Sequence, residues 1–114
     1  MANPSKTKGD RGELEAAAIC TQLFGLPVRR KLGAGRQDDT GDLEGLPGHV
    51  VQVANWKDIA AALRIKPKEA EQQRINAQAE HAATLIRLRG GEWRVSLTLE
   101  QWARYLQAMG LVER

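Results

Sequence analysis

Asp42 and Gln52 are the residues whose types and spacing most suggest chemistry in this chain. Asp42 stands beside Leu43-Glu44, which is typical of a short strand, and Gln52 interrupts the apolar run 50–53. The Leu46-Pro47-Gly48 sequence between them suits a type II turn, because proline presets φ and glycine supplies a positive φ. The sequence therefore predicts a hairpin with an acid and an amide on facing strands. Such a pair suggests a functional site.

The second strand of this hairpin is predicted from residues 50–53. These residues are mostly β-branched and apolar, as in a central strand covered on both faces. Because side chains alternate along a strand, Gln52 and Ala54 share one face, whereas Val51 and Val53 share the other. Two structural alternatives stay open: a hydrogen-bonded core amide at Gln52, and a surface acid beside the turn at Asp42.

The bulk properties indicate one globular domain. The chain has 114 residues, of which 42% are hydrophobic and 27% are charged. A net charge of +3 permits a nucleic-acid partner without requiring one. The single cysteine, Cys20, excludes an internal disulfide and fits a reducing compartment. With neither a membrane-spanning apolar run nor a secretory leader, we expect a cytoplasmic protein with no membrane partner.

The first part of the chain predicts an arm followed by a helix. Residues 1–8 are polar and basic and are expected to form a flexible arm, whereas residues 9–114 form the domain. A helix is predicted from Asp10 to Phe24, ending at Gly25. Glu13 falls within the apolar side of this helix. A carboxylate there must be paired, metal-bound or placed in the solvated first turn.

A basic strand and a glycine-rich loop are predicted next. The strand covers Leu26–Leu32 and carries the cationic residues Arg29, Arg30 and Lys31. The loop, residues 33–36, adds Arg36. It lacks the Gly-Lys-Ser/Thr sequence of a P-loop and is therefore only a weak phosphate signal.

The second half predicts helices around a hairpin. Asp58 is expected to cap a short helix over 59–63, followed by a longer polar helix from Pro67 to about Glu80. Segments 82–89 and 92–98 predict a hairpin turning at two glycines. A capping box at Thr98 starts a last helix. The residues expected to line one face of that helix are Leu99, Trp102, Ala103, Leu106 and Met109.

Four segments occur in an order and spacing that suggest a family. They are Gly9-x-x-x-Glu13, the loop 33–36, Gly41-Asp42 and Val50–Asn55. With these, about the first half of the chain resembles the PD-(D/E)xK nucleases, within them the small Holliday junction resolvase-like endonucleases of archaea and phages. The resemblance implies an α/β fold with a restriction-endonuclease-like core. We therefore expect a mixed central β-sheet flanked by helices, in the order αβββαββα.

The family's metal site maps onto the hairpin. The resemblance implies that two acids from facing strands hold Mg²⁺, for which Mn²⁺ can substitute, together with a backbone carbonyl. Asp42 occupies the first acid position and Gln52 the second, while Val53 would supply the carbonyl. Glu13 corresponds to a helix carboxylate that some members add. Gln52 departs from the family pattern, because an amide is a neutral ligand.

The lysine of the family motif is also missing. In the family it stands two residues past the second acid and orients or activates the attacking water. Here that position is Ala54, which has no ammonium group. The lysines that could replace it are Lys57, nearby in sequence, and Lys66 and Lys68 on the following helix.

The resemblance implies a DNA endonuclease acting on branched or phage-replication DNA, in the host cytoplasm if the protein is phage-encoded. Phosphate contacts would come from Arg29, Arg30, Lys31 and Arg36. Resolvases cut two strands symmetrically, so we expect a homodimer. Two alternatives stay open: a catalytically inactive DNA-binding protein on the same fold, and a small α/β interaction module without a nucleic-acid role.

Overall fold

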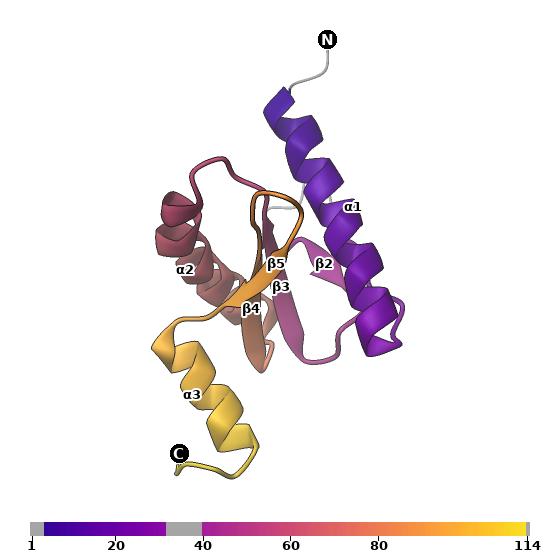
Figure 1. The fold of residues 1–114 in the computed structure, drawn as a ribbon. Coiled ribbons are helices and arrows are strands. Elements are labelled where there is room, and N and C mark those ends of the chain that lie inside the picture. The colour runs from indigo at the N-terminus through magenta and orange to yellow at the C-terminus, as the bar shows by residue number, and fades with distance from the viewer. Residues whose placement is uncertain (1–3, 32–39, 114) are drawn as a thin grey trace.

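The computed structural model describes residues 4–31 and 40–113 (Figure 1). The glycine-rich loop, with Arg36, lies outside these described residues. The helices are α1 (Pro4–Phe24), α2 (Ile59–Ala77) and α3 (Leu99–Ala108). The strands are β1 (Arg29–Arg30), β2 (Leu43–Glu44), β3 (His49–Ala54), β4 (His81–Arg87) and β5 (Trp93–Ser96). Among the described residues, no helix is both long and apolar enough to span a membrane.

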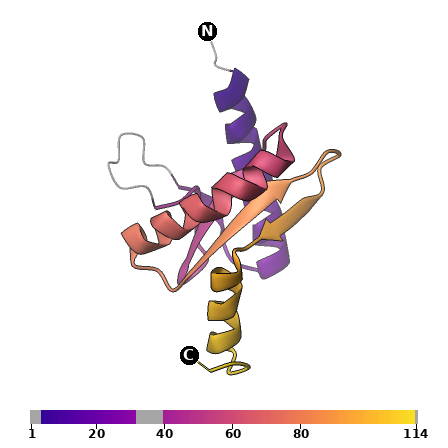
Figure 2. The ribbon, with the colours of Figure 1, turned by 90° about the vertical axis from the view of Figure 1, so that its left-hand side faces the viewer.

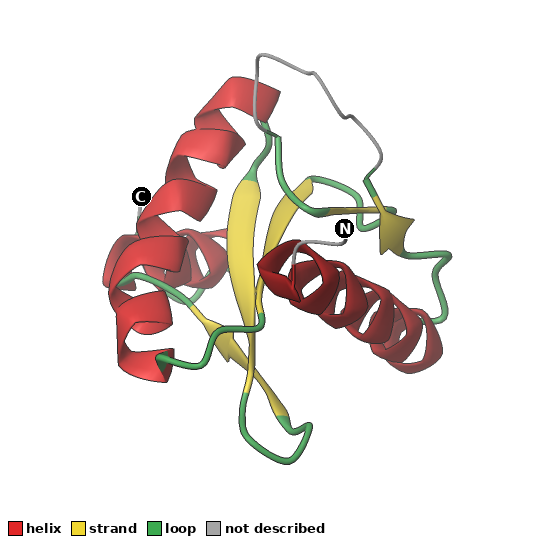
Figure 3. Ribbon diagram, turned by 90° about the horizontal axis from the view of Figure 1, so that it is seen from above, coloured by secondary structure: helices red, strands yellow, loops and turns green. Residues whose placement is uncertain are grey.

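The strands form one mixed sheet in the order β1-β2-β3-β4-β5. β3 and β4 run parallel and are connected by α2, whereas the other neighbouring strands are antiparallel. Figure 3 shows α1 on one face of the sheet and α2 on the other. The α/β class, the mixed central sheet with flanking helices and the order of elements are thus confirmed.

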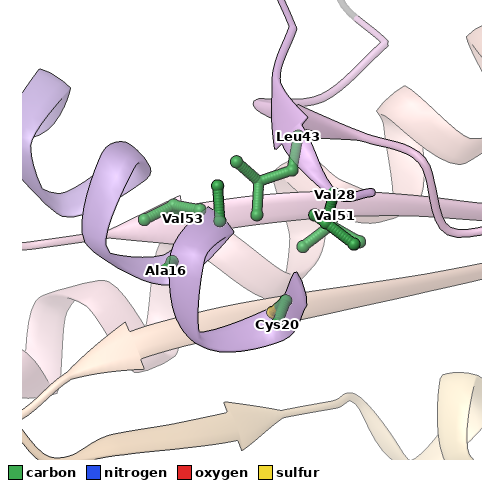
Figure 4. Close-up of a cluster of buried hydrophobic side chains, with 7 residues drawn as sticks. Ala16, Cys20, Val28, Leu43, Val51 and Val53 are labelled. Atoms are coloured by element: carbon green, nitrogen blue, oxygen red, sulfur yellow. The ribbon is translucent and has the colours of Figure 1, made fainter. Parts of the chain in front are cut away.

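The main hydrophobic core lies between α1 and the strands β2 and β3 (Figure 4). Its buried members are Ala16, Ala17, Cys20, Val28, Leu43, Val51 and Val53. A smaller cluster of Ala54, Ala62 and Ile86 fills the other face of the sheet, beneath α2. The two clusters bury both faces of β3, which explains its apolar sequence. The Gln52 side chain therefore lies on a buried face of β3, the face that α2 covers.

Three element boundaries differ from the prediction. Helix α1 begins at Pro4 rather than Asp10, so residues 4–8, assigned to the arm, are helical. Proline suits the first turn of a helix, and the helix continues through Gly9 and Gly12 to the apolar part. The predicted strand Leu26–Leu32 is reduced to β1. The two predicted helices on either side of Pro67 are one continuous helix, α2.

Helix α2 tolerates Pro67 because tertiary contacts surround it. Its N-terminus is capped as predicted, with Asp58 Oδ1 accepting from the Ala61 amide at 3.0 Å. Pro67 is buried, and its carbonyl accepts from Nε2 of Gln101, on α3, at 3.0 Å. The local rule that proline starts or breaks a helix is overridden here by packing.

Helix α3 is attached by polar contacts and by its Tyr105 ring, which stacks on His81 with the ring centroids 4.2 Å apart. Gln101, which is 1% exposed, contacts Pro67, and Arg104 Nη1 donates to Glu71 Oε1 at 2.9 Å. The apolar face predicted for α3 is largely open, with Leu99 77% and Met109 68% exposed. Figure 2 shows α3 extending away from the sheet.

Glu71 links α2 to α3, and its replacement by glutamine should weaken the fold. Hydrogen bonds from Arg74, and then from Arg104 and Gln101, lower the pKa of Glu71 from 4.5 to about 2. Since the folded pKa is depressed, this stabilisation is present above pH 4.5 and is lost as pH falls toward 2. We expect Glu71→Gln to reduce the free energy of unfolding by about 2 kcal/mol at pH 7 in urea titrations.

The same substitution should have less effect at pH 2, where about half of Glu71 is itself protonated. The matched control is Glu92→Gln, which removes an exposed carboxylate paired with Arg94 at 3.3 Å. Equal losses from both variants at pH 7 would contradict this role of Glu71.

Candidate active site

Asp42 is held rigidly at the edge where β2 meets β3. It lies one residue before β2, and its amide donates to the Val51 carbonyl at 2.9 Å. Its Oδ2 accepts from the Val53 amide at 2.8 Å. Gly41 makes this approach possible, because its φ is +104° and a Cβ there would lie 2.9 Å from Cγ1 of Val50. The carboxylate is thus fixed against β3.

Gln52 connects Asp42 to α2. The side chain is buried, 3% exposed, and the surrounding hydrogen-bond network assigns its amide orientation. In that orientation Oε1 accepts from Nζ of Lys66 at 3.1 Å. Nε2 donates to Asp42 Oδ2 at 3.1 Å and to Oε1 of Gln73 at 3.0 Å. The amide therefore bridges the strand acid and a helix lysine.

Lys66 brings an ammonium group to the place where β3 has none. Ala54, at the family's lysine position, is 0% exposed and packs against Ala62 of α2. One helical turn further, the Lys66 side chain is 17% exposed and its Nζ lies 3.1 Å from Oε1 of Glu69. Nζ also lies 5.2 Å from the ring centroid of Trp56. These contacts hold the ammonium beside Gln52.

A cleft of about 490 Å³, the central cleft, opens between α1, β3 and α2. The lining residues that could contact a substrate or an ion include Glu13, Asp42, Val53, Lys57 and Lys66. Gln52 does not line this cleft, but it contacts two residues that do, Asp42 and Lys66. The predicted acid therefore shares the central cleft with two of the three candidate lysines, of which Lys66 is connected to it through Gln52.

Glu13 reaches the central cleft because α1 lies very close to the end of β3. A Cβ on Gly12 would be 2.8 Å from Cβ of Asn55, so only glycine allows this spacing. Glu13 Oε1 accepts from Nε of Arg30 at 3.1 Å, and the same guanidinium contacts Oδ1 of Asp10 at 2.9 Å. Glu13 is thus paired, as one of the sequence alternatives required.

The two other candidate lysines occupy different positions. Lys57 lies past the end of β3, is exposed, and lines the central cleft. Lys68 is exposed and lines a separate cleft of about 650 Å³ with Leu63 and Leu97. Lys68 is therefore not brought together with Asp42.

The cationic side chains predicted to contact DNA partly interact with groups of the protein itself. Arg29 lies 3.5 Å from Oε1 of Glu44, and Arg30 binds the two acids of α1. Nζ of Lys31 donates to the Thr40 carbonyl at 3.4 Å. Of the described cluster, Arg29 remains the most exposed, with 78% of its side chain accessible.

The donor set can be tested against the expected magnesium ion. Within the parts of the chain described here, no three His, Cys, Asp or Glu side chains form a metal-binding group. The available oxygens are the Asp42 carboxylate and the Val53 carbonyl, which faces the same side as the Val53 amide. Mg²⁺ is commonly held by one or two carboxylates together with substrate phosphates. Asp42 and Val53 could therefore supply only part of a magnesium shell, which other oxygens would have to complete.

Sequence reasoning missed Gly12 and Trp56. Nothing in the sequence distinguishes Gly12 from Gly9, although only Gly12 lies against β3 and a Cβ on Gly9 would meet nothing. Trp56 had a detectable signal, since an aromatic residue two positions past a buried strand lies near the strand end, where substrates often bind. It lines the central cleft.

No protein-family model, no curated protein and no solved structure matches the chain. The resemblance to PD-(D/E)xK nucleases therefore stays a prediction.

Proposed function

We propose that the protein is a magnesium-dependent DNA endonuclease whose catalytic lysine is supplied by α2 instead of β3. One observation carries this proposal: Asp42 and Lys66 line the same cleft and are joined through Gln52. A carboxylate that could hold a metal ion and an ammonium group beside it could together serve metal-assisted phosphodiester hydrolysis.

Each residue has a distinct role in this proposal. Asp42, oriented by the Val53 amide, would hold Mg²⁺ together with the Val53 carbonyl. Bound there, the ion would polarise the scissile phosphate and stabilise the leaving oxygen. The Lys66 ammonium would orient the attacking water and contact the phosphate. Gln52 fixes the positions of Asp42 and Lys66, and Glu13 could join the metal only by leaving Arg30.

A catalytically inactive DNA-binding protein is the second candidate. It is favoured by the orientation of Gln52, which directs an amide N–H₂ rather than a carboxylate toward Asp42. The ion pair between Glu13 and Arg30 also favours the inactive candidate, since it occupies the Glu13 carboxylate, which lines the central cleft with Asp42. This candidate would keep DNA affinity without hydrolysis. The homodimer and the cytoplasmic location stay predictions under either candidate.

Cleavage of labelled DNA separates the two candidates. The purified protein is incubated with a four-way junction and with linear duplex, in Mg²⁺, Mn²⁺ or EDTA. We expect nicking in either metal, none in EDTA, and a loss of at least about 10³-fold in Asp42→Ala. DNA that is retarded but uncut would support the inactive candidate. If the protein neither cleaves DNA nor binds it at low salt, the remaining alternative is a small α/β interaction module without a nucleic-acid role.

A further inference from the structure

A second cleft continues from the central cleft and is strongly basic. This basic cleft, of about 280 Å³, contains four cationic residues: Lys8, Lys57, Arg87 and Arg89. No Asp or Glu is among its lining residues in the described chain. It shares Lys8, Lys57, Asn55 and Trp56 with the central cleft, so the two form a continuous path.

The charges of the basic cleft are more available than those predicted for DNA binding. Lys8, Lys57 and Arg89 are exposed, and none of them forms an ion pair within residues 4–31 and 40–113. Arg87 is held by Glu15, at 3.0 Å. By contrast, Arg30 is bound to two carboxylates. Unpaired cations in a row are the arrangement that neutralises successive phosphates.

Trp56 adds an aromatic surface between the two clefts. Trp56 lines both clefts, and it is 36% exposed although it lies only two residues past the buried strand β3. The Lys66 ammonium lies 5.2 Å from the ring centroid of Trp56, and this contact holds the ring beside the central cleft. Exposed aromatic rings within a cationic groove bind unpaired bases by stacking.

We infer that a single-stranded DNA segment lies along this path, with one unpaired base stacked on Trp56 and its phosphates on Lys57 and Arg89. The inference rests on the proposed function for the identity of the ligand as DNA, and it adds the strandedness that the site selects. Paired bases are hidden within the duplex stack, so duplex DNA could use the cations but not the ring.

Binding in EDTA tests the inference without cleavage. Anisotropy of a labelled single strand and of the matched duplex is measured with the full chain. We expect Trp56→Leu to weaken binding of the single strand about 10-fold while changing duplex binding less than about twofold. Trp102→Leu, which removes an exposed tryptophan on α3, is the control and should change neither. Trp56→Phe should retain most of the affinity.

The phosphate contacts are tested by salt dependence. The double variant Lys57→Gln with Arg89→Gln should reduce the slope of log K against log salt by about 1.4 for the single strand. Arg64→Gln, which removes an exposed arginine that lines the cleft of Lys68, should leave the slope unchanged. Equal effects of Trp56→Leu and Trp102→Leu, or an unchanged slope in the double variant, would overturn the inference. If these binding effects appear but no metal-dependent cleavage does, the inference holds and the endonuclease proposal fails.

Discussion

Replacing Lys66 with alanine is expected to lower the rate of DNA cleavage about 10²- to 10³-fold. The reason is that Lys66 is the lysine whose Nζ contacts Gln52, the residue that also binds Asp42. Binding of DNA in EDTA should change less than about threefold, because one phosphate contact contributes little at moderate salt. The measurement is single-turnover cleavage beside anisotropy binding with the same oligonucleotide.

Lys68→Ala is the matched control for this variant. It removes an ammonium group two residues away on α2. Lys68 lines the separate cleft with Leu63 and Leu97, so the cleavage rate should be unchanged. Lys66→Arg keeps the charge and should recover part of the rate, which separates catalysis from a loss of packing. Full activity in Lys66→Ala, or equal losses in Lys66→Ala and Lys68→Ala, would exclude Lys66 as the relocated lysine.

Gln52→Glu is expected to raise the affinity for Mg²⁺ about tenfold and to increase cleavage by a similar factor at limiting Mg²⁺. The substitution places a second carboxylate within hydrogen-bond distance of Asp42, at a position that is 3% exposed. Without metal the two like charges repel, so the variant should melt at a lower temperature in EDTA. Added Mg²⁺ should stabilise it more than it stabilises the wild-type protein.

Gln73→Glu provides the control, since it adds the same charge to a neighbouring amide that is 2% exposed but lies on α2 instead of on the hairpin. It should not gain Mg²⁺-dependent activity. An absence of any gain in Gln52→Glu would contradict the assignment of this hairpin as a nuclease site. Ala54→Lys, the other reversal toward the family motif, has no room in this fold, because Ala54 is 0% exposed against Ala62 and Ile86.

The hairpin bearing Asp42 and Gln52 could be predicted because its signals are local. A proline-glycine turn and a β-branched run specify two strands without help from the rest of the chain, and Gly48 takes the predicted positive φ of 72°. The caps at Asp58 and Thr98 are equally local and are confirmed. The order of elements follows from such signals.

The predictions that were wrong or missing concern features that depend on contacts between distant segments. Pro67 appeared to start a helix, and only its contact with Gln101 shows how the helix continues through it. Dividing α2 into two helices at Pro67 also hid which lysine lies beside Gln52. The side of a helix on which a residue lies depends on where that helix begins and how far it continues. The pairing of Arg30 with Glu13 joins residues that no local pattern relates.

We propose that Asp42 and Lys66 act in one catalytic centre, a claim that a double-mutant cycle can test. Cleavage rates are measured for the wild type, Asp42→Ala, Lys66→Ala and the double variant, all in Mg²⁺. Groups that act as a unit are strongly non-additive. We predict that the double variant is no slower than the slower single variant. Losses that multiply, or a wild-type protein that does not cleave at all, would contradict the claim.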